Sequence, residues 1–116
     1  MCNGEILLVD DEADFVASLV ELLEDEGYSV RTAANGREAL EQLGSGSPPC
    51  LVILDLRMPI MSGNEVYAAM QERPELASIP VLVSSSWDAS QAPAGALFMR
   101  KPINPDRMLD VIRQFC

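Results

Sequence analysis

Short runs of consecutive apolar residues alternate along the chain with longer segments in which apolar residues recur every three or four positions. The first pattern is typical of strands buried on both faces, and the second of helices with one face against a core. Together they predict strands at residues 6–9, 28–33, 50–54, 81–83 and 97–99. They also predict helices at residues 13–26, 37–43, 64–73 and 106–115. Elements in this order form a parallel sheet with right-handed crossovers and helices on both faces, an α/β fold.

The alternation fails between the fourth and fifth predicted strands. Residues 87–96 contain few large apolar side chains, and Pro93 interrupts them. Proline removes a helical hydrogen bond, and an amphipathic helix needs an apolar face. We therefore predict that the fourth helix is shortened or irregular, and that a turn or loop stands in its place.

The composition is that of an ordinary globular domain. Hydrophobic residues make up 48% of the chain and charged residues 22%, and no apolar run approaches the roughly 18 residues of a membrane helix. At 116 residues we expect one domain over 1–116, with no signal peptide and no membrane partner. The net charge of −10 argues against direct binding to nucleic acid and favours a cation or a partner with a basic surface.

The cysteine and histidine content narrows the chemistry. Cys2, Cys50 and Cys116 are an odd number without C-x-x-C spacing, so we expect neither a disulfide framework nor a zinc site. A reducing, cytoplasmic location fits this pattern best. The chain has no histidine, which excludes histidine metal sites, catalytic triads and a role as a phosphohistidine carrier. Carboxylates must therefore carry any chemistry.

Polar residues follow four of the predicted strands. In parallel α/β sheets ligands bind beyond the carboxyl ends of the strands, so these residues are expected to meet at one edge. They are Asp10, Asp11, Asp55, Ser84 to Ser86 and Lys101. Three carboxylates repel one another unless a cation compensates them, and oxygen ligands favour Mg²⁺ or Mn²⁺. One carboxylate can then attack phosphorus while the ion and the lysine offset phosphoryl charge.

Each of these residues, taken alone, also has an ordinary structural explanation. Asp10 and Asp11 suit the positive end of a helix dipole, and Asp55 suits a turn. The order and spacing of four separate segments, all at strand ends, favour a phosphoryl-transfer site over those explanations.

Residues 55–63, Asp-Leu-Arg-Met-Pro-Ile-Met-Ser-Gly, resemble the signature D-x-x-M-P-x-M-x-G of response-regulator receiver domains, the CheY-like family of bacterial two-component signalling. Residues 9–11, 79–85 and 101–102 match other family segments in the right order, so the resemblance covers nearly the whole chain. It implies a flavodoxin-like fold with a five-stranded parallel sheet in the order 2-1-3-4-5.

The resemblance implies a role for each residue of the pocket. Asp55 would accept the phosphoryl group, with catalytic help from two side chains that bind it, Ser85 and Lys101. Mg²⁺ ligands would be Asp11, Asp55 and the backbone carbonyl of Arg57, with Asp10 acting through a bound water. Ser85 and Phe98 would form the switch, although Phe98 alone is better explained as a core aromatic.

The resemblance also implies the partners. Receivers of this kind take phosphoryl groups from a histidine kinase or a histidine phosphotransfer protein, and they act on a downstream effector protein that the sequence does not identify. They catalyse only their own aspartyl phosphorylation and dephosphorylation. Whether the receiver is free-standing or part of a longer chain stays open.

Two other functions stay open beside this one. A pseudo-receiver would bind a partner protein without being phosphorylated, which the altered residues 87–96 favour and the intact Asp11, Asp55 and Lys101 disfavour. A Mg²⁺-dependent phosphatase with an aspartyl intermediate would resemble D-x-D-x-T/V, but the second residue after Asp55 is Arg57, not an acid.

The chain departs from the family between Ser85 and Lys101, which are 16 positions apart and closer than in most receivers. Output through another surface is expected as a result. We also hypothesise that Arg57 and Trp87 flank the path of the hydrolytic water, and that the bulk of Trp87 slows loss of the phosphoryl group.

Overall fold

The computed structural model of the chain describes residues 4–86 and 91–116. Its strands are β1 (Glu5–Val9), β2 (Ser29–Ala33), β3 (Leu51–Leu54), β4 (Val81–Ser85) and β5 (Leu97–Arg100). Its helices are α1 (Ala13–Asp25), α2 (Gly36–Leu43), α3 (Gly63–Gln71), α4 (Pro74–Ala77) and α5 (Pro105–Phe115). In the described part of the chain, no helix is long and apolar enough to cross a membrane.

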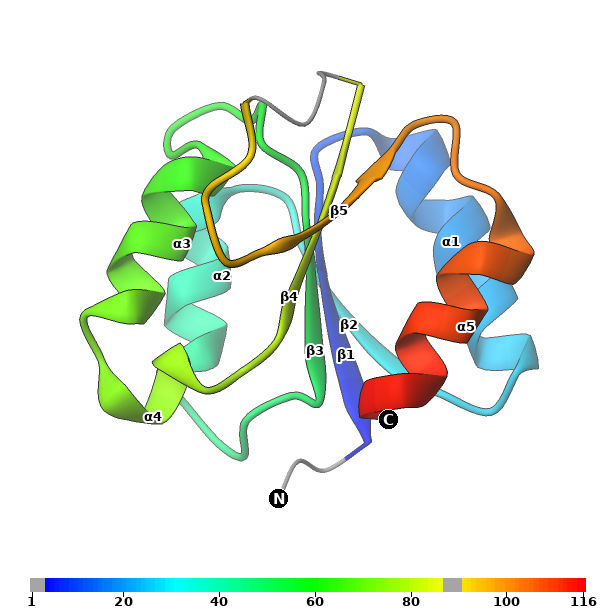
Figure 1. The fold of residues 1–116 in the computed structure, drawn as a ribbon, viewed down its shortest axis with the longest axis horizontal. Helices are drawn as coiled ribbons and strands as arrows, with labels where there is room; N and C mark the ends of the chain where they lie inside the picture. Colours follow the sequence, from blue (N-terminus) through cyan, green and yellow to red (C-terminus); the bar gives the residue numbers. More distant parts are fainter. Residues whose placement is uncertain (1–3, 87–90) are drawn as a thin grey trace.

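The strands form one parallel sheet in the order β2-β1-β3-β4-β5, which confirms the predicted topology. Helices α1 and α5 cover one face of the sheet, and α2, α3 and α4 lie on the other (Figure 1). Each strand and each long helix begins and ends within two residues of its predicted bounds. The exception is α4, which was not predicted: Pro74 disfavours helical geometry at Arg73 and starts a separate turn.

Alternate residues of the two central strands face opposite layers, as the period of two in a strand requires. Leu7 and Val52 pack in the core under α2 and α3, and Leu8 and Ile53 pack in the core under α1 and α5. All residues of β3, and the four residues 6–9 of β1, are buried. Two apolar layers thus fix the strands whose carboxyl ends carry the acidic residues.

The connection from β4 to β5 lacks a regular helix in the residues that the structure describes there, 91–96. Ala92 and Ala96 pack against the core on the α3 side, and the side-chain amide of Asn64 donates to the carbonyl of Gln91 at 3.2 Å. Gly95 has a φ of +94°, and a Cβ there would lie 2.9 Å from the Tyr67 hydroxyl. The predicted irregular segment is confirmed over 91–96, and the rest of it, 87–90, falls outside the described residues.

A disulfide joins Cys50, just before β3, to Cys116, just after α5. The prediction that the cysteines form no disulfide is therefore wrong. The two cysteines are 66 positions apart, so their spacing along the chain gave no signal. The fold brings the amino end of β3 and the carboxyl end of α5 to the same end of the sheet. The Cα atoms of Cys50 and Cys116 are 5.6 Å apart there, within the ordinary range for a disulfide.

Candidate functional site

The three predicted carboxylates meet at the carboxyl ends of β1 and β3. These strands are neighbours, with Val9 opposite Leu54, so the residues that follow them leave the sheet side by side. Oxygen atoms of Asp10, Asp11 and Asp55 all lie within 4.8 Å of one another. The sheet order reverses at β1, which has β2 on one side and β3 on the other, and this is where ligands bind in such folds.

The carboxylates differ in their surroundings. Asp10 is 3% exposed and Asp55 is 7% exposed, whereas Asp11 lies open to solvent. The pKa of Asp55 is raised from 3.8 to about 6, mainly by burial and next by the negative charge of Asp10, against the opposing effect of Lys101. The free pocket therefore holds more negative charge than it can stabilise well, and a bound cation would relieve this.

Lys101 is held at the centre of the site. Its ammonium nitrogen lies 2.8 Å from Asp10 Oδ2 and 2.9 Å from Glu12 Oε1, and it lies 4.1 Å from the centre of the Phe15 ring. Burial disfavours the ammonium form, but the hydrogen bonds to Asp10 and Glu12 outweigh it and raise the pKa of Lys101 above its ordinary value. Lys101 is therefore a fixed positive charge beside the carboxylates.

Both oxygens of Asp10 are used in these contacts. Oδ2 accepts from Lys101, and Oδ1 accepts from the backbone N–H of Glu12 at 2.9 Å. The backbone N–H of Lys101 donates to the carbonyl of Ser85 at 2.9 Å. The start of α1, the end of β4 and the end of β5 are thus tied to one another around the lysine.

A cavity of about 510 Å³ opens above the carboxylates and is lined by Asp11, Glu12, Asp55, Arg57, Met58, Pro59, Ser86 and Lys101. Glu12 was not among the predicted site residues, and Ser86 was predicted only as one of the three serines at the end of the fourth strand. Glu12 had a signal in its position directly after two aspartates, but its pairing with Lys101 depends on residues 89 positions apart. Ser86 is the last of three consecutive serines, and the sequence alone does not show which of the three lines the cavity.

Ser85 and Phe98 lie on the neighbouring strands β4 and β5, and neither is among the residues that line this cavity. Ser85 is 1% exposed at the end of β4, opposite Arg100 of β5. Phe98 lies opposite Val83 and packs, partly buried, against the core on the α3 side. Trp87, which the hydrolysis hypothesis concerns, falls outside the described residues.

The segment after Asp55 ends at Gly63, where the surrounding backbone leaves no room for a side chain. A Cβ at this position would collide with the backbone carbonyl oxygen of Asp55 and would lie 2.8 Å from the Leu56 Cα. The Gly63 N–H donates to the Leu56 carbonyl at 2.9 Å, and Ser62 and Glu65 form a capping box at the start of α3. Glycine therefore lets α3 begin directly against the strand end that carries Asp55.

The strand order and the two helical layers define a flavodoxin-like α/β domain with an acidic pocket where the strand order reverses. The chain belongs to the response regulator receiver domain family, whose profile matches residues 6–113. The resemblance seen in residues 55–63 is thereby confirmed. Domains of this family are phosphorylation switches that generally bind Mg²⁺, and they interact with histidine kinases and downstream effectors.

Relatives include both short and long proteins. Sporulation initiation phosphotransferase F of Bacillus subtilis is 31% identical over 121 residues, a match that covers 99% of this chain and 95% of the relative. The alkaline phosphatase synthesis transcriptional regulatory protein PhoP of Bacillus subtilis is 35% identical over 109 residues, covering 89% of this chain but 44% of PhoP. The crystal structure of the response regulator TrrA from Thermotoga maritima, in complex with Mg²⁺-BeF, has a TM-score of 0.86 at 31% identity, covering 97% of this chain and 99% of TrrA.

Proposed function

We propose that this chain, as a single receiver domain over 1–116, is the phosphoacceptor of a two-component phosphorelay. Asp55 takes a phosphoryl group from a phosphohistidine on a histidine kinase or a histidine phosphotransfer protein. The observation that carries this proposal is the grouping of the Asp10, Asp11 and Asp55 carboxylates within 4.8 Å, beside a lysine that lines the same cavity.

The transfer is a substitution at phosphorus. A carboxylate oxygen of Asp55 forms a bond to phosphorus while the bond to the imidazole nitrogen of the donor breaks. Lys101 supplies positive charge for the phosphoryl oxygens, and the Ser85 hydroxyl donates to one of them. Movement of Ser85 toward the phosphoryl group leaves space that Phe98 fills, which changes the surface seen by a downstream effector.

The pocket suits Mg²⁺, with Mn²⁺ as a substitute. Asp11, Asp55 and the backbone carbonyl of Arg57 would hold the ion, and Asp10 would contact it through water. These are oxygen ligands, and the two buried carboxylates in a confined space need a compensating charge. When bound, the ion supplies further charge stabilisation to the phosphoryl group.

The proposed role carries a location and a class of activity. The chain works in the cytoplasm, modifies only its own Asp55 and is not an enzyme acting on other substrates. It contacts a phosphodonor and a downstream effector, with no direct binding to nucleic acid or membrane. The acidic balance of the chain, −10, supports protein partners over nucleic acid.

The test is intact-mass measurement after incubation with Mg²⁺ and acetyl phosphate. We expect the wild type to gain the mass of one phosphoryl group, and expect Asp55→Asn and an EDTA-treated wild type to gain none. Asp14→Asn, which changes an exposed carboxylate in the first turn of α1, is the matched control and should be labelled like the wild type. Labelling of Asp55→Asn would contradict the assignment of the acceptor.

A pseudo-receiver is the second candidate function. The observation in its favour is the irregular connection at residues 91–96, where a helix was not formed. This candidate predicts no phosphoryl adduct in any of the proteins above. It also predicts that beryllofluoride, a mimic of the phosphoryl group, does not bind the pocket in the presence of Mg²⁺. The phosphatase alternative predicts release of phosphate from an added phosphomonoester.

A further inference from the structure

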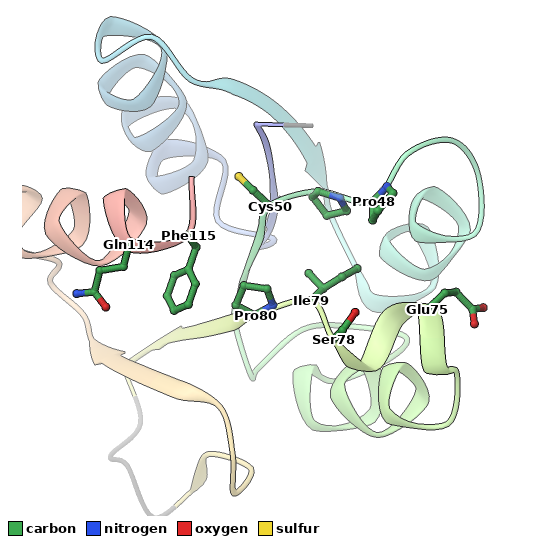
Figure 2. A pocket seen from close by; sticks show the side chains of 9 residues that line it. Pro48, Cys50, Glu75, Ser78, Ile79, Pro80, Gln114 and Phe115 are labelled. Atoms are coloured by element: carbon green, nitrogen blue, oxygen red, sulfur yellow. The ribbon is translucent and has the colours of Figure 1, made fainter. Parts of the chain in front are cut away.

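The Cys50–Cys116 pair lies at the end of the sheet opposite the phosphorylation pocket. Cys50 immediately precedes β3, is 1% exposed and belongs to the core shared with α1 and α5. Cys116 follows the last turn of α5 and is exposed to solvent. Figure 2 shows Cys50 and Phe115, the last residue of α5, among the side chains that line one pocket.

We propose that Cys50 and Cys116 form a reversible redox site, in which a low-molecular-weight disulfide of the glutathione type oxidises the two thiols and a thiol reduces them again. The bond ties the end of α5 to the start of β3 in the oxidised protein and releases it in the reduced one.

The chemistry is thiol–disulfide exchange and needs no other reactant. The Cys116 thiolate attacks a sulfur of the small disulfide, forming a mixed disulfide and releasing one thiolate. The Cys50 thiolate then attacks Cys116 Sγ and displaces the second. Two thiols of the protein lose two electrons and two protons, and the small disulfide becomes two thiols.

The fold can accommodate both states. Helix α5 is anchored by Met108, Leu109 and Ile112, which are buried in the core shared with α1 and the sheet. The backbone N–H of Cys116 also donates to the Ile112 carbonyl at 2.9 Å, which holds the end of the helix. A reduced Cys50 would remain as a small apolar side chain in an apolar cluster. Breaking the bond therefore loosens the last turn without unfolding the domain.

The surroundings give a reagent access. Cys116 is exposed, and a cavity of about 370 Å³ lies next to Cys50, lined among others by Pro48, Pro80, Gln114 and Phe115 (Figure 2). Exchange can thus begin at Cys116, the exposed residue, and finish at Cys50, the buried one. If the chain is cytoplasmic, as proposed above, a disulfide there is expected to be transient and redox-sensing instead of permanent.

The bond acts on the two elements next to the phosphorylation pocket. Asp55 directly follows β3, and α5 begins four residues after Lys101. The disulfide holds the far ends of these same elements together, so the oxidised domain restricts how α5 can shift against β3. Amide hydrogen exchange in the last turn of α5 should be slower in the oxidised protein than in the reduced one.

The test is a thiol count on the folded protein equilibrated with glutathione buffers of increasing oxidised fraction, followed by acid quenching and peptide mapping. With three cysteines in the chain, we expect three free thiols under reducing conditions and one under oxidising conditions, with Cys50 and Cys116 in one cross-linked peptide pair. Cys2→Ser is the matched control and should keep the transition. Cys50→Ser and Cys116→Ser should lose it.

A second measurement separates a site built by the fold from chance pairing. In urea the same bond must close a 66-residue separation in a flexible chain, so its equilibrium constant should be roughly 10³-fold lower than in the folded protein. Equal constants in both states would overturn the proposal. So would glutathione adducts without a cross-link, or a bond that reducing buffer does not open in the folded protein. Because the readout is thiols and not Asp55, failure here leaves the phosphoacceptor proposal unaffected.

Discussion

The raised pKa of Asp55 predicts that the ionised side chain of this residue lowers the stability of the metal-free domain at neutral pH. Replacement of Asp55 by asparagine keeps the shape of the side chain and removes its charge. The folded protein binds a proton at Asp55 more tightly than the unfolded chain does, with a pKa of about 6 against 3.8. The resulting stabilisation is complete below pH 3.8 and is lost as the pH rises to about 6, so the ionised wild type is at a disadvantage above that pH.

The magnitude follows from the shift. Each pKa unit corresponds to about 1.36 kcal/mol, so a shift of about two units gives an upper limit of about 3 kcal/mol at pH 8. At pH 5 the wild type has recovered about half of this through protonation, so the advantage of Asp55→Asn should fall by about half. Work nearer pH 4 is unfavourable because the pI is about 4.2 and the protein carries little net charge there.

The assay is urea unfolding at pH 5 and pH 8, in EDTA so that no divalent ion compensates the carboxylates. We expect Asp55→Asn to be more stable than the wild type at both values, by about 1–3 kcal/mol at pH 8 and by less at pH 5. Glu24→Gln, which changes an exposed carboxylate on α1, should stay within about 0.5 kcal/mol of the wild type at both. A variant less stable than the wild type at pH 8, or a gain independent of pH, would refute the reasoning.

Three further predictions concern other parts of the molecule. Gly63→Ala should lower the free energy of unfolding by more than about 2 kcal/mol, because the added Cβ would collide with backbone atoms. Gly46→Ala, at a position with a φ of +77° and open space around it, should lower it by about 1 kcal/mol. Urea unfolding that ranks the two variants the other way would contradict this. Glu12→Gln removes one of the two ion pairs of Lys101, and because the Glu12 side chain is 66% exposed, the free energy of unfolding should change by less than about 0.5 kcal/mol. Labelling by acetyl phosphate should become about two- to threefold faster, because the lysine is held less firmly away from the phosphoryl group. A slower rate in a mass-spectrometric time course would show instead that Glu12 positions the lysine productively. Dithiothreitol should lower the free energy of unfolding of the wild type by about 4 kcal/mol, the loop-closure value for a 66-residue separation. The stability of Cys116→Ser should not change with dithiothreitol, and an equal effect on the wild type and the variant would rule out the bond as its cause.

Features encoded locally or by a repeating pattern could be predicted from the sequence. The apolar runs of β1 and β3 identified the central strands, and the residues after them, Asp10 and Asp55, were correctly expected to meet. Pro93 and the lack of apolar residues around it correctly indicated an irregular connection over the described residues 91–96. These predictions succeed because each depends on periodicity or on a single residue with restricted backbone geometry.

Features that depend on distant residues could not be predicted. The Cys50–Cys116 bond and the Lys101–Glu12 ion pair join residues 66 and 89 positions apart, and no spacing rule applies to either. The raised pKa of Asp55 depends on its burial and on the nearby charge of Asp10, which the residue type does not reveal. The helix α4 was missed because a single four-residue turn has no apolar period to detect.

If a divalent ion binds in the position proposed above, it and Lys101 compete for the negative charge of one carboxylate, Asp10. In the free pocket both oxygens of Asp10 are engaged, one by the Lys101 ammonium and one by the Glu12 N–H. A cation that draws on the negative charge of Asp10 weakens the attraction that holds the ammonium there. Thermodynamic reciprocity then requires that loosening Lys101 strengthens cation binding to the same extent. On the proposed function, occupancy of the metal position and the freedom of the Lys101 side chain would therefore be coupled, and a change in one would shift the other.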